Sequence, residues 1–133
     1  MNWLIVTLVL LVLLYVVVMV SFRMWKRTRV SEADKKFFNQ HWNHILAEGN
    51  YSNQIMQADK LLDQMLKKRG FDGTLGDKLK KASKMFSDRN GLWEAHKLRN
   101  KIAHEVGFQV TTSAKNMAME GFKKAFIDLG LIK

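Results

Sequence analysis

The chain of 133 residues has room for one compact domain and carries a formal net charge of +10. It contains no cysteine, which excludes disulfides, thiolate zinc sites and cysteine nucleophiles and is typical of a reducing compartment. The excess of Lys and Arg favours a polyanionic partner such as RNA or a membrane surface, although a basic helical surface is also compatible with simple solvation.

An uncharged apolar segment, Trp3 to Phe22, opens the chain. As a helix it would extend about 30 Å, which matches the hydrocarbon core of a bilayer. Its many Val residues disfavour a helix in water, but in lipid the backbone N–H and C=O groups must be hydrogen-bonded within the segment, and this selects a helix. We therefore expect residues 1–22 to form a single transmembrane anchor.

Two other interpretations of this segment are a cleaved signal peptide and a buried helix of a soluble core. A signal peptide is disfavoured because no Lys or Arg precedes the apolar run and no small-residue cleavage site follows it. A soluble core helix is disfavoured because an uncharged run of this length is rare in soluble domains.

A basic linker, residues 23–30, follows the apolar segment. Its cations are Arg23, Lys26, Arg27 and Arg29. The positive-inside rule therefore places the remainder of the chain in the cytoplasm. Trp3 and Trp25 flank the apolar run, as expected of indole rings that lie at the two headgroup layers.

Residues 31–133 are expected to form one helical domain, because apolar residues recur at helical spacing, Pro is absent, and no strand pattern or repeat is present. The expected helices cover residues 31–49, 51–70, 74–86, 92 to about 104, and 111 or 112 to 130, with a turn at 87–91. Short connections between amphipathic helices favour antiparallel packing. The fold class is therefore all-α, with one transmembrane helix followed by a five-helix bundle.

Residue types at the helix ends support these boundaries. Ser31 is the expected N-cap of the first helix, and Thr74 with Asp77 forms a capping-box pair at the third. Gly70 and Gly130 are the expected stops of the second and fifth helices.

The stretch "HKLRNKIAHE", from His96 to Glu105, concentrates polar residues on the fourth helix. His96, Asn100 and His104 are spaced four apart and share one side of a helix. Metal binding is disfavoured, because "HEVGF" has Phe108 where an H-E-x-x-H motif needs its second His. The sequence as a whole contains no nucleophile elbow and no phosphate-binding loop, and we expect no cofactor.

The sequence "RNKIAH" fits an R-x-x-x-x-H motif with a polar residue after the Arg, and it resembles the motif of HEPN domains. The resemblance covers about Tyr51 to Gly130 and extends to small membrane-anchored bacterial proteins, which implies an inner-membrane location. It implies a small helical bundle that cleaves RNA without a metal, as a homodimer whose two motifs meet. Twelve Lys or Arg residues against six acids between Asp59 and Lys101 suit a polyanionic substrate.

Three residues would carry this chemistry. The resemblance implies that His104 acts as acid or base and that Arg99 stabilises the charge that develops on the phosphate. Asn100 would orient His104 or a phosphate oxygen, since it lies one helical turn from His104.

A structural role for the same residues remains open. Arg and His are favoured near a helix C-terminus by its dipole, and Arg99 could pair with Asp59 or Asp63 of the second helix. In that case the chain would be a non-catalytic, membrane-tethered interaction or dimerisation module.

The topology gives a first testable prediction. A reporter fused after Lys133 should be active in the cytoplasm, because the basic linker is retained on that side. Digestion of the domain by a protease added outside intact cells would contradict this orientation.

Overall fold

The computed structural model describes residues 2–133, without the side chains of residues 26–28, so the predictions made for the side chains of Lys26 and Arg27 lie outside the described residues. The helices are α1 (Trp3–Thr28), α2 (Glu32–Leu46), α3 (Tyr51–Lys68), α4 (Leu75–Lys81), the 3-10 helix η1 (Ser83–Met85), α5 (Arg89–His104) and α6 (Thr112–Asp128). The described part of the chain contains no strand, which confirms the all-helical class.

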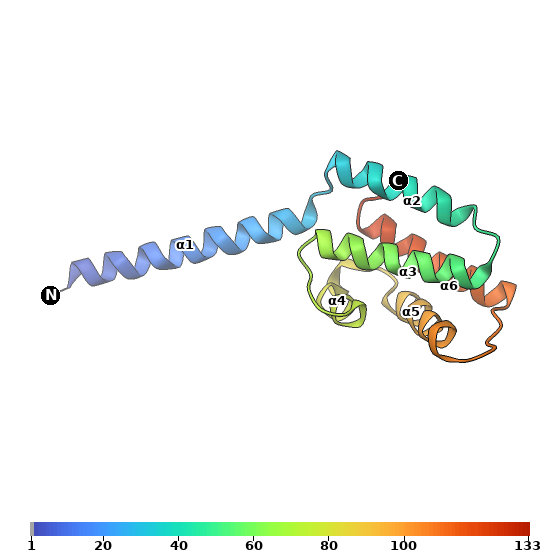
Figure 1. Cartoon of the computed structure of the whole chain (residues 1–133). Coiled ribbons are helices and arrows are strands. Elements are labelled where there is room, and N and C mark those ends of the chain that lie inside the picture. Colours follow the sequence, from blue (N-terminus) through green and yellow to red (C-terminus); the bar gives the residue numbers. More distant parts are fainter. Residues whose placement is uncertain (1) are drawn as a thin grey trace.

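The apolar helix α1 projects away from the rest of the molecule (Figure 1). The segment Trp3–Trp25 of α1 is long and apolar enough to cross a membrane. Its mean hydropathy reaches 3.1, and none of the stretch over which this value is averaged is buried. The segment therefore contributes nothing to a soluble core. The helix also continues through the basic residues to Thr28 instead of ending with the apolar run.

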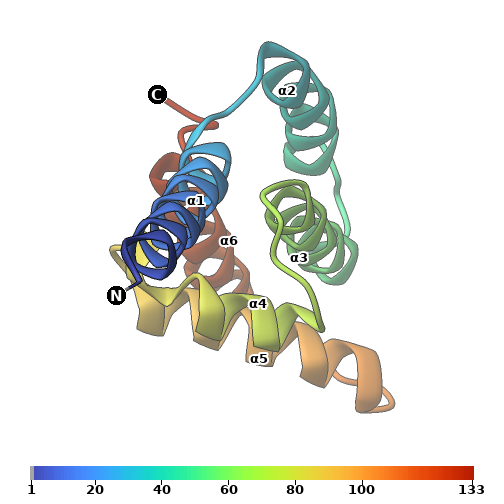
Figure 2. The ribbon, with the colours of Figure 1, turned by 90° about the vertical axis from the view of Figure 1, so that its left-hand side faces the viewer.

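Helices α2, α3, α5 and α6 form the bundle, and α3 packs against the other three (Figure 2). Its amphipathic face places Ile55 and Leu62 in the core. The aromatic rings of Phe38 and Trp42 from α2 pack against Phe126 of α6, with centroids 4.8 and 5.0 Å from that ring. These large buried rings fix α2 and α6 against each other.

Several helix ends follow the predictions made from residue type. The Ser31 hydroxyl accepts a hydrogen bond from the Asp34 N–H at 3.1 Å, and Thr74 with Asp77 forms a complete capping box. At Gly70 φ is +84°. The Gly70 N–H donates to the Lys67 carbonyl and the next N–H to the Leu66 carbonyl, so α3 ends in a Schellman motif.

Three predicted boundaries are wrong. Helix α2 ends at Leu46, three residues before the expected stop at Gly49. The third predicted helix is divided at Ala82 into α4 and η1, and η1 ends where the chain becomes extended at Phe86, whose ring is buried. The predicted turn at 87–91 already contains the start of α5 at Arg89, because the Asp88 carboxylate accepts a hydrogen bond from the Gly91 N–H at 2.9 Å and caps the helix.

Helices α5 and α6 approach each other closely at two glycines. A Cβ added to Gly121 would lie 2.8 Å from the carbonyl oxygen of Gly91 and 3.0 Å from its carbonyl carbon. These are backbone atoms, which cannot move aside as a side-chain end can. The contact explains a glycine in the middle of α6, where alanine would be the better helix former.

We predict that Gly121→Ala destabilises the domain by about 1 to 3 kcal/mol, because overpacking against α5 exceeds the gain of about 1 kcal/mol in helix propensity. Urea unfolding of the full chain in detergent, followed by circular dichroism, measures the change. Gly49→Ala is the matched control, since a Cβ there meets nothing within 4 Å. Equal stability of Gly121→Ala and wild type would contradict the close approach of α5 and α6.

Candidate functional site

An open cleft of about 790 Å³ lies between α3, the start of α4, and α5. Its polar lining comes from all three elements and includes Asp59, Asp63, Thr74, His96, Arg99 and Asn100. Two of the three predicted site residues, Arg99 and Asn100, therefore face the same cavity. Both residues belong to α5, which crosses α3 (Figure 2).

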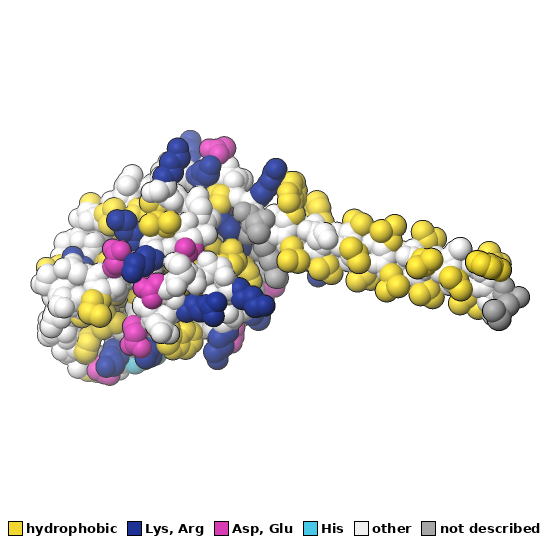
Figure 3. Space-filling model, turned by 180° about the vertical axis from the view of Figure 1, so that it is seen from behind, with side chains coloured by type: hydrophobic (Ala, Val, Ile, Leu, Met, Phe, Trp, Pro, Cys, Tyr) yellow, Lys and Arg dark blue, Asp and Glu magenta, His cyan; other side chains and the backbone are white. Residues whose placement is uncertain are grey.

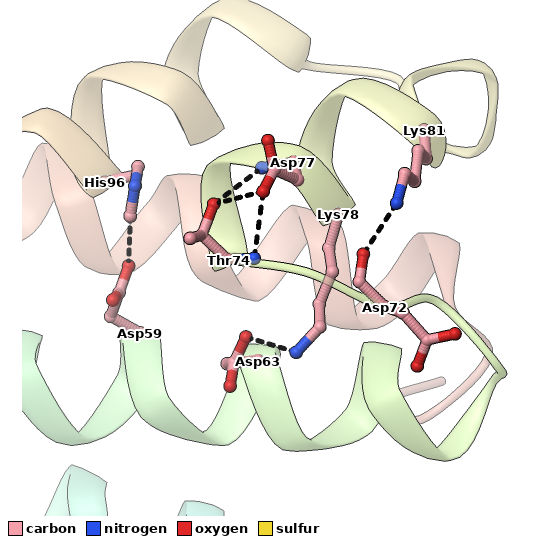
Figure 4. Close-up of polar contacts among 8 residues, drawn as sticks. All are labelled: Asp59, Asp63, Asp72, Thr74, Asp77, Lys78, Lys81 and His96. Carbon is pink, nitrogen blue, oxygen red and sulfur yellow. Dashed lines mark hydrogen bonds and ion pairs between the residues drawn. The ribbon is translucent and has the colours of Figure 1, made fainter.

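The Asp59 carboxylate is the central group of the cleft. The residue is only 4% exposed. One carboxylate oxygen lies 2.9 Å from His96 Nδ1 (Figure 4), and the other lies 3.2 Å from Arg99 Nε. A buried carboxylate is costly unless it is paired in this way. The pairing of Arg99 with Asp59, one of the two partners weighed from the sequence, is present.

The Arg99 side chain is held from two sides. Its Nη1 donates a hydrogen bond to Asn100 Oδ1 at 3.2 Å. Its Nε is buried and close to Asp59, but the N–H does not point at the carboxylate well enough to form a hydrogen bond. The side chain is 33% exposed, so Asp59 and Asn100 position a guanidinium that solvent or a ligand can still reach.

His104 lies elsewhere. It is the last residue of α5, it is exposed, and it does not line the cleft. In the described part of the chain no side-chain hydrogen bond joins it to Asn100, whose side-chain oxygen Oδ1 instead accepts from Arg99 Nη1. The structure thus brings Arg99 and Asn100 together and leaves His104 about one helical turn beyond them.

The other wall of the cleft is formed around α4. Lys78 is nearly buried, and its Nζ lies 2.7 Å from the Asp63 carboxylate of α3 (Figure 4). Hydrogen bonds from the Thr74 hydroxyl and backbone N–H lower the pKa of Asp77 and keep the start of α4 in place. Two carboxylates of α3 therefore hold the elements around the cleft in place: Asp59 pairs with residues of α5, and Asp63 pairs with a residue of α4.

Sequence reasoning weighed Asp59 only as a possible partner of Arg99 and did not identify it as the buried centre of the site, and it treated His96 as a neighbour of the motif. A signal for Asp59 exists, because it follows Ile55 by four residues and precedes Leu62 by three, a position on the apolar face of α3. An acid at such a position requires a partner. Which partner it has depends on the packing of α5 against α3, which the sequence does not specify.

Among the described residues no group of three His, Asp or Glu side chains could hold a metal ion. Comparison of the chain with protein-family models, with curated proteins and with solved structures finds no match. The chemistry of the cleft must therefore be argued from its own residues.

We predict that Asp59→Ala destabilises the domain by about 2 kcal/mol or more, because it leaves the Arg99 and His96 side chains without the buried carboxylate that they pair with. Glu94→Ala is the matched control, since it removes an exposed carboxylate paired with Lys97. That change should stay within about 0.5 kcal/mol. Equal losses in the two variants, measured by urea unfolding, would show that the Asp59 pairs are not structural.

Proposed function

We propose that the chain is a membrane-anchored HEPN-like ribonuclease whose cytoplasmic domain cleaves RNA as a homodimer without a metal ion. The observation that carries the proposal is the R-x-x-x-x-H segment of α5, with Arg99 positioned in an open cleft by Asp59 and Asn100 and with His104 exposed beyond it. A fixed guanidinium and an accessible imidazole are the two groups that cleavage of a ribose phosphate requires.

The reaction follows from these groups. The 2'-OH attacks the adjacent phosphorus, the bond to the 5'-oxygen breaks, and the products are a 2',3'-cyclic phosphate and a 5'-OH. A His104 imidazole takes the proton from the 2'-OH, and the imidazolium of a second His104 gives a proton to the leaving oxygen. Each protomer has one such histidine, so two protomers supply both groups.

The helix geometry supports a two-protomer site. Arg99 and His104 are five residues apart, which at about 100° per residue separates their directions by about 140°. One helix therefore cannot easily present both side chains to the same phosphate, whereas two copies of α5 can exchange them. The anchor assists this, because confinement to a bilayer raises the effective concentration of the second copy.

Asp59 and Asn100 act on Arg99 in this proposal. Asp59 lies beside its Nε as an ion-pair partner and Asn100 accepts from its Nη1, and we assign the remaining nitrogen, Nη2, to the phosphate. The ion pair between Arg99 and Asp59 lowers the net positive charge at the site. In this proposal Arg99 therefore interacts more strongly with the negative charge that develops on the phosphate in the transition state than with the phosphate of the bound RNA before the reaction. Arg99 is then a catalytic residue, and Asn100 a positioning residue.

A second candidate is a non-catalytic module that dimerises or binds a protein partner in front of the membrane. Two observations favour it. Asp59 already neutralises Arg99, and His104 does not line the cleft that holds Arg99 and Asn100.

RNA cleavage by the purified full chain in nanodiscs, with EDTA present, separates the two candidates. We expect His104→Ala and Arg99→Ala each to lower the rate by about 100-fold or more, through loss of proton transfer and of charge stabilisation. Lys80→Ala is the control, because an exposed cation outside the cleft should change only binding and its salt dependence.

Two outcomes would contradict the ribonuclease. One is that folded wild-type protein, dense enough in the disc to dimerise, leaves diverse RNAs intact. The other is that His104→Ala cleaves as fast as wild type, since the activity would then come from another source. Either result favours the interaction module.

A further inference from the structure

A second cleft, of about 870 Å³, lies where α1 meets the helical domain. Among the described side chains, four cations line it, and they come from two distant parts of the sequence. Arg23 and Arg29 belong to the end of α1 and the residue after it, whereas Lys68 and Arg69 belong to the end of α3. Figure 3 shows Lys and Arg side chains around the end of the domain from which the apolar helix projects.

The positive charge of this junctional cleft is only partly neutralised. Two carboxylates line it with the four cations, those of Asp34 and Asp72. Lys68 Nζ lies 3.2 Å from Asp34 Oδ1. Burial raises the pKa of Asp34, but hydrogen bonds from Ser31 and Lys68 outweigh it and hold the pKa below its usual value. Asp34 therefore stays charged at neutral pH, and the cleft retains an excess of cations.

Arg69 is the most buried of these cations. It is only 7% exposed, and its Nη2 donates a hydrogen bond to the Leu129 carbonyl at the end of α6. Burial lowers the pKa of its guanidinium, yet arginine remains ionised in proteins. Its position at the capped end of α3 fixes this charge in the wall of the cleft.

The α1 side of the cleft belongs to a membrane boundary. The Arg29 guanidinium lies 4.3 Å from the centre of the Trp25 ring, a cation–π contact, and Trp25 ends the segment that is apolar enough to span a bilayer. Trp and Arg at such a boundary typically lie at the level of the lipid headgroups. The cleft therefore opens where the phosphates of a bilayer would be.

We propose that this junctional cleft binds the phosphate of an anionic phospholipid headgroup. A lipid is favoured over a soluble phosphate because an inserted α1 holds the cleft among headgroups, where their local concentration is far higher than that of any free ion. The domain supplies two of the four cations. A bound headgroup therefore ties the end of α3 to the membrane surface and fixes the orientation of the domain.

The test uses the full chain in nanodiscs of phosphatidylcholine, alone or mixed with phosphatidylglycerol, and native mass spectrometry to count the lipids that remain bound. We expect phosphatidylglycerol to be retained in preference. Lys68→Gln and Arg29→Gln should each lower this preference about fivefold, which corresponds to about 1 kcal/mol per cation. Circular dichroism of each variant in phosphatidylcholine discs checks its fold, and either folded variant suffices for the test.

The matched controls are Lys97→Gln and Lys101→Gln. They remove the same charge from exposed positions near the end of α5, outside the cleft. Their lipid preference should equal that of wild type. Equal loss in these controls would overturn the proposal in favour of general surface electrostatics, and so would the absence of any preference in wild type. A shift in thermal unfolding with inorganic phosphate in phosphatidylcholine discs, equal to that with phosphatidylglycerol, would assign the cleft to a soluble anion instead.

Discussion

The buried carboxylate of Asp59 is the interaction on which the arrangement of α3 and α5 depends. A charge removed from water costs several kcal/mol unless it is paired, and its two partners, His96 and Arg99, stand three residues apart on α5. Helix α5 must therefore cross α3 with that face inward. Leu92 and Ala95, one turn earlier, then continue the same face into the apolar core. The end of the α3–α5 crossing that holds His96 and Arg99 is polar. It is not filled by apolar side chains and remains open as the cleft.

Local chemistry was predictable from the sequence, and non-local packing was not. Ser31 and Thr74 cap their helices as expected, because a cap needs only residues three positions away. Asp88 uses the same chemistry, but the glycine that follows at Gly91 suggested a turn. That glycine instead leaves room for the Asp88 carboxylate that caps α5, since a Cβ at Gly91 would overlap this carboxylate. The backbone of Gly91 also lies against Gly121 of α6, far along the chain, and only the packed structure reveals why Gly121 lacks a Cβ.

The same distinction between local features, which the sequence predicts, and non-local packing, which it does not, applies to the candidate site. The motif identified Arg99 and Asn100 on one helix, and both line the cleft. Arg99 is positioned by Asp59 of α3, and α4 is held against α3 by the pair of Lys78 with Asp63. His104 is adjacent in the motif but not in the cleft, because a spacing of five residues does not return to the same face of an α-helix. A motif read as one unit along the sequence is therefore split in space, and a complete ribonuclease site would have to be assembled from two copies.

Helix α3 connects the two clefts and relates both proposals. It carries Asp59 in one cleft and Lys68 in the other, nine residues apart, or about 14 Å along the helix axis. The end of α3 that bears Lys68 is the one nearest α1, and α3 runs away from it along roughly the direction in which α1 points (Figure 1). A headgroup held by Lys68 would therefore place Arg99 close above the lipid phosphates. The negative surface of an anionic membrane repels RNA over about a Debye length, some 8 Å at physiological ionic strength. In the proposed ribonuclease the cleft would lie roughly 14 Å above the phosphates, beyond most of this repulsion but too near the surface for a large folded RNA to enter from that side. A single strand that enters laterally, between two domains fixed side by side, would satisfy both constraints.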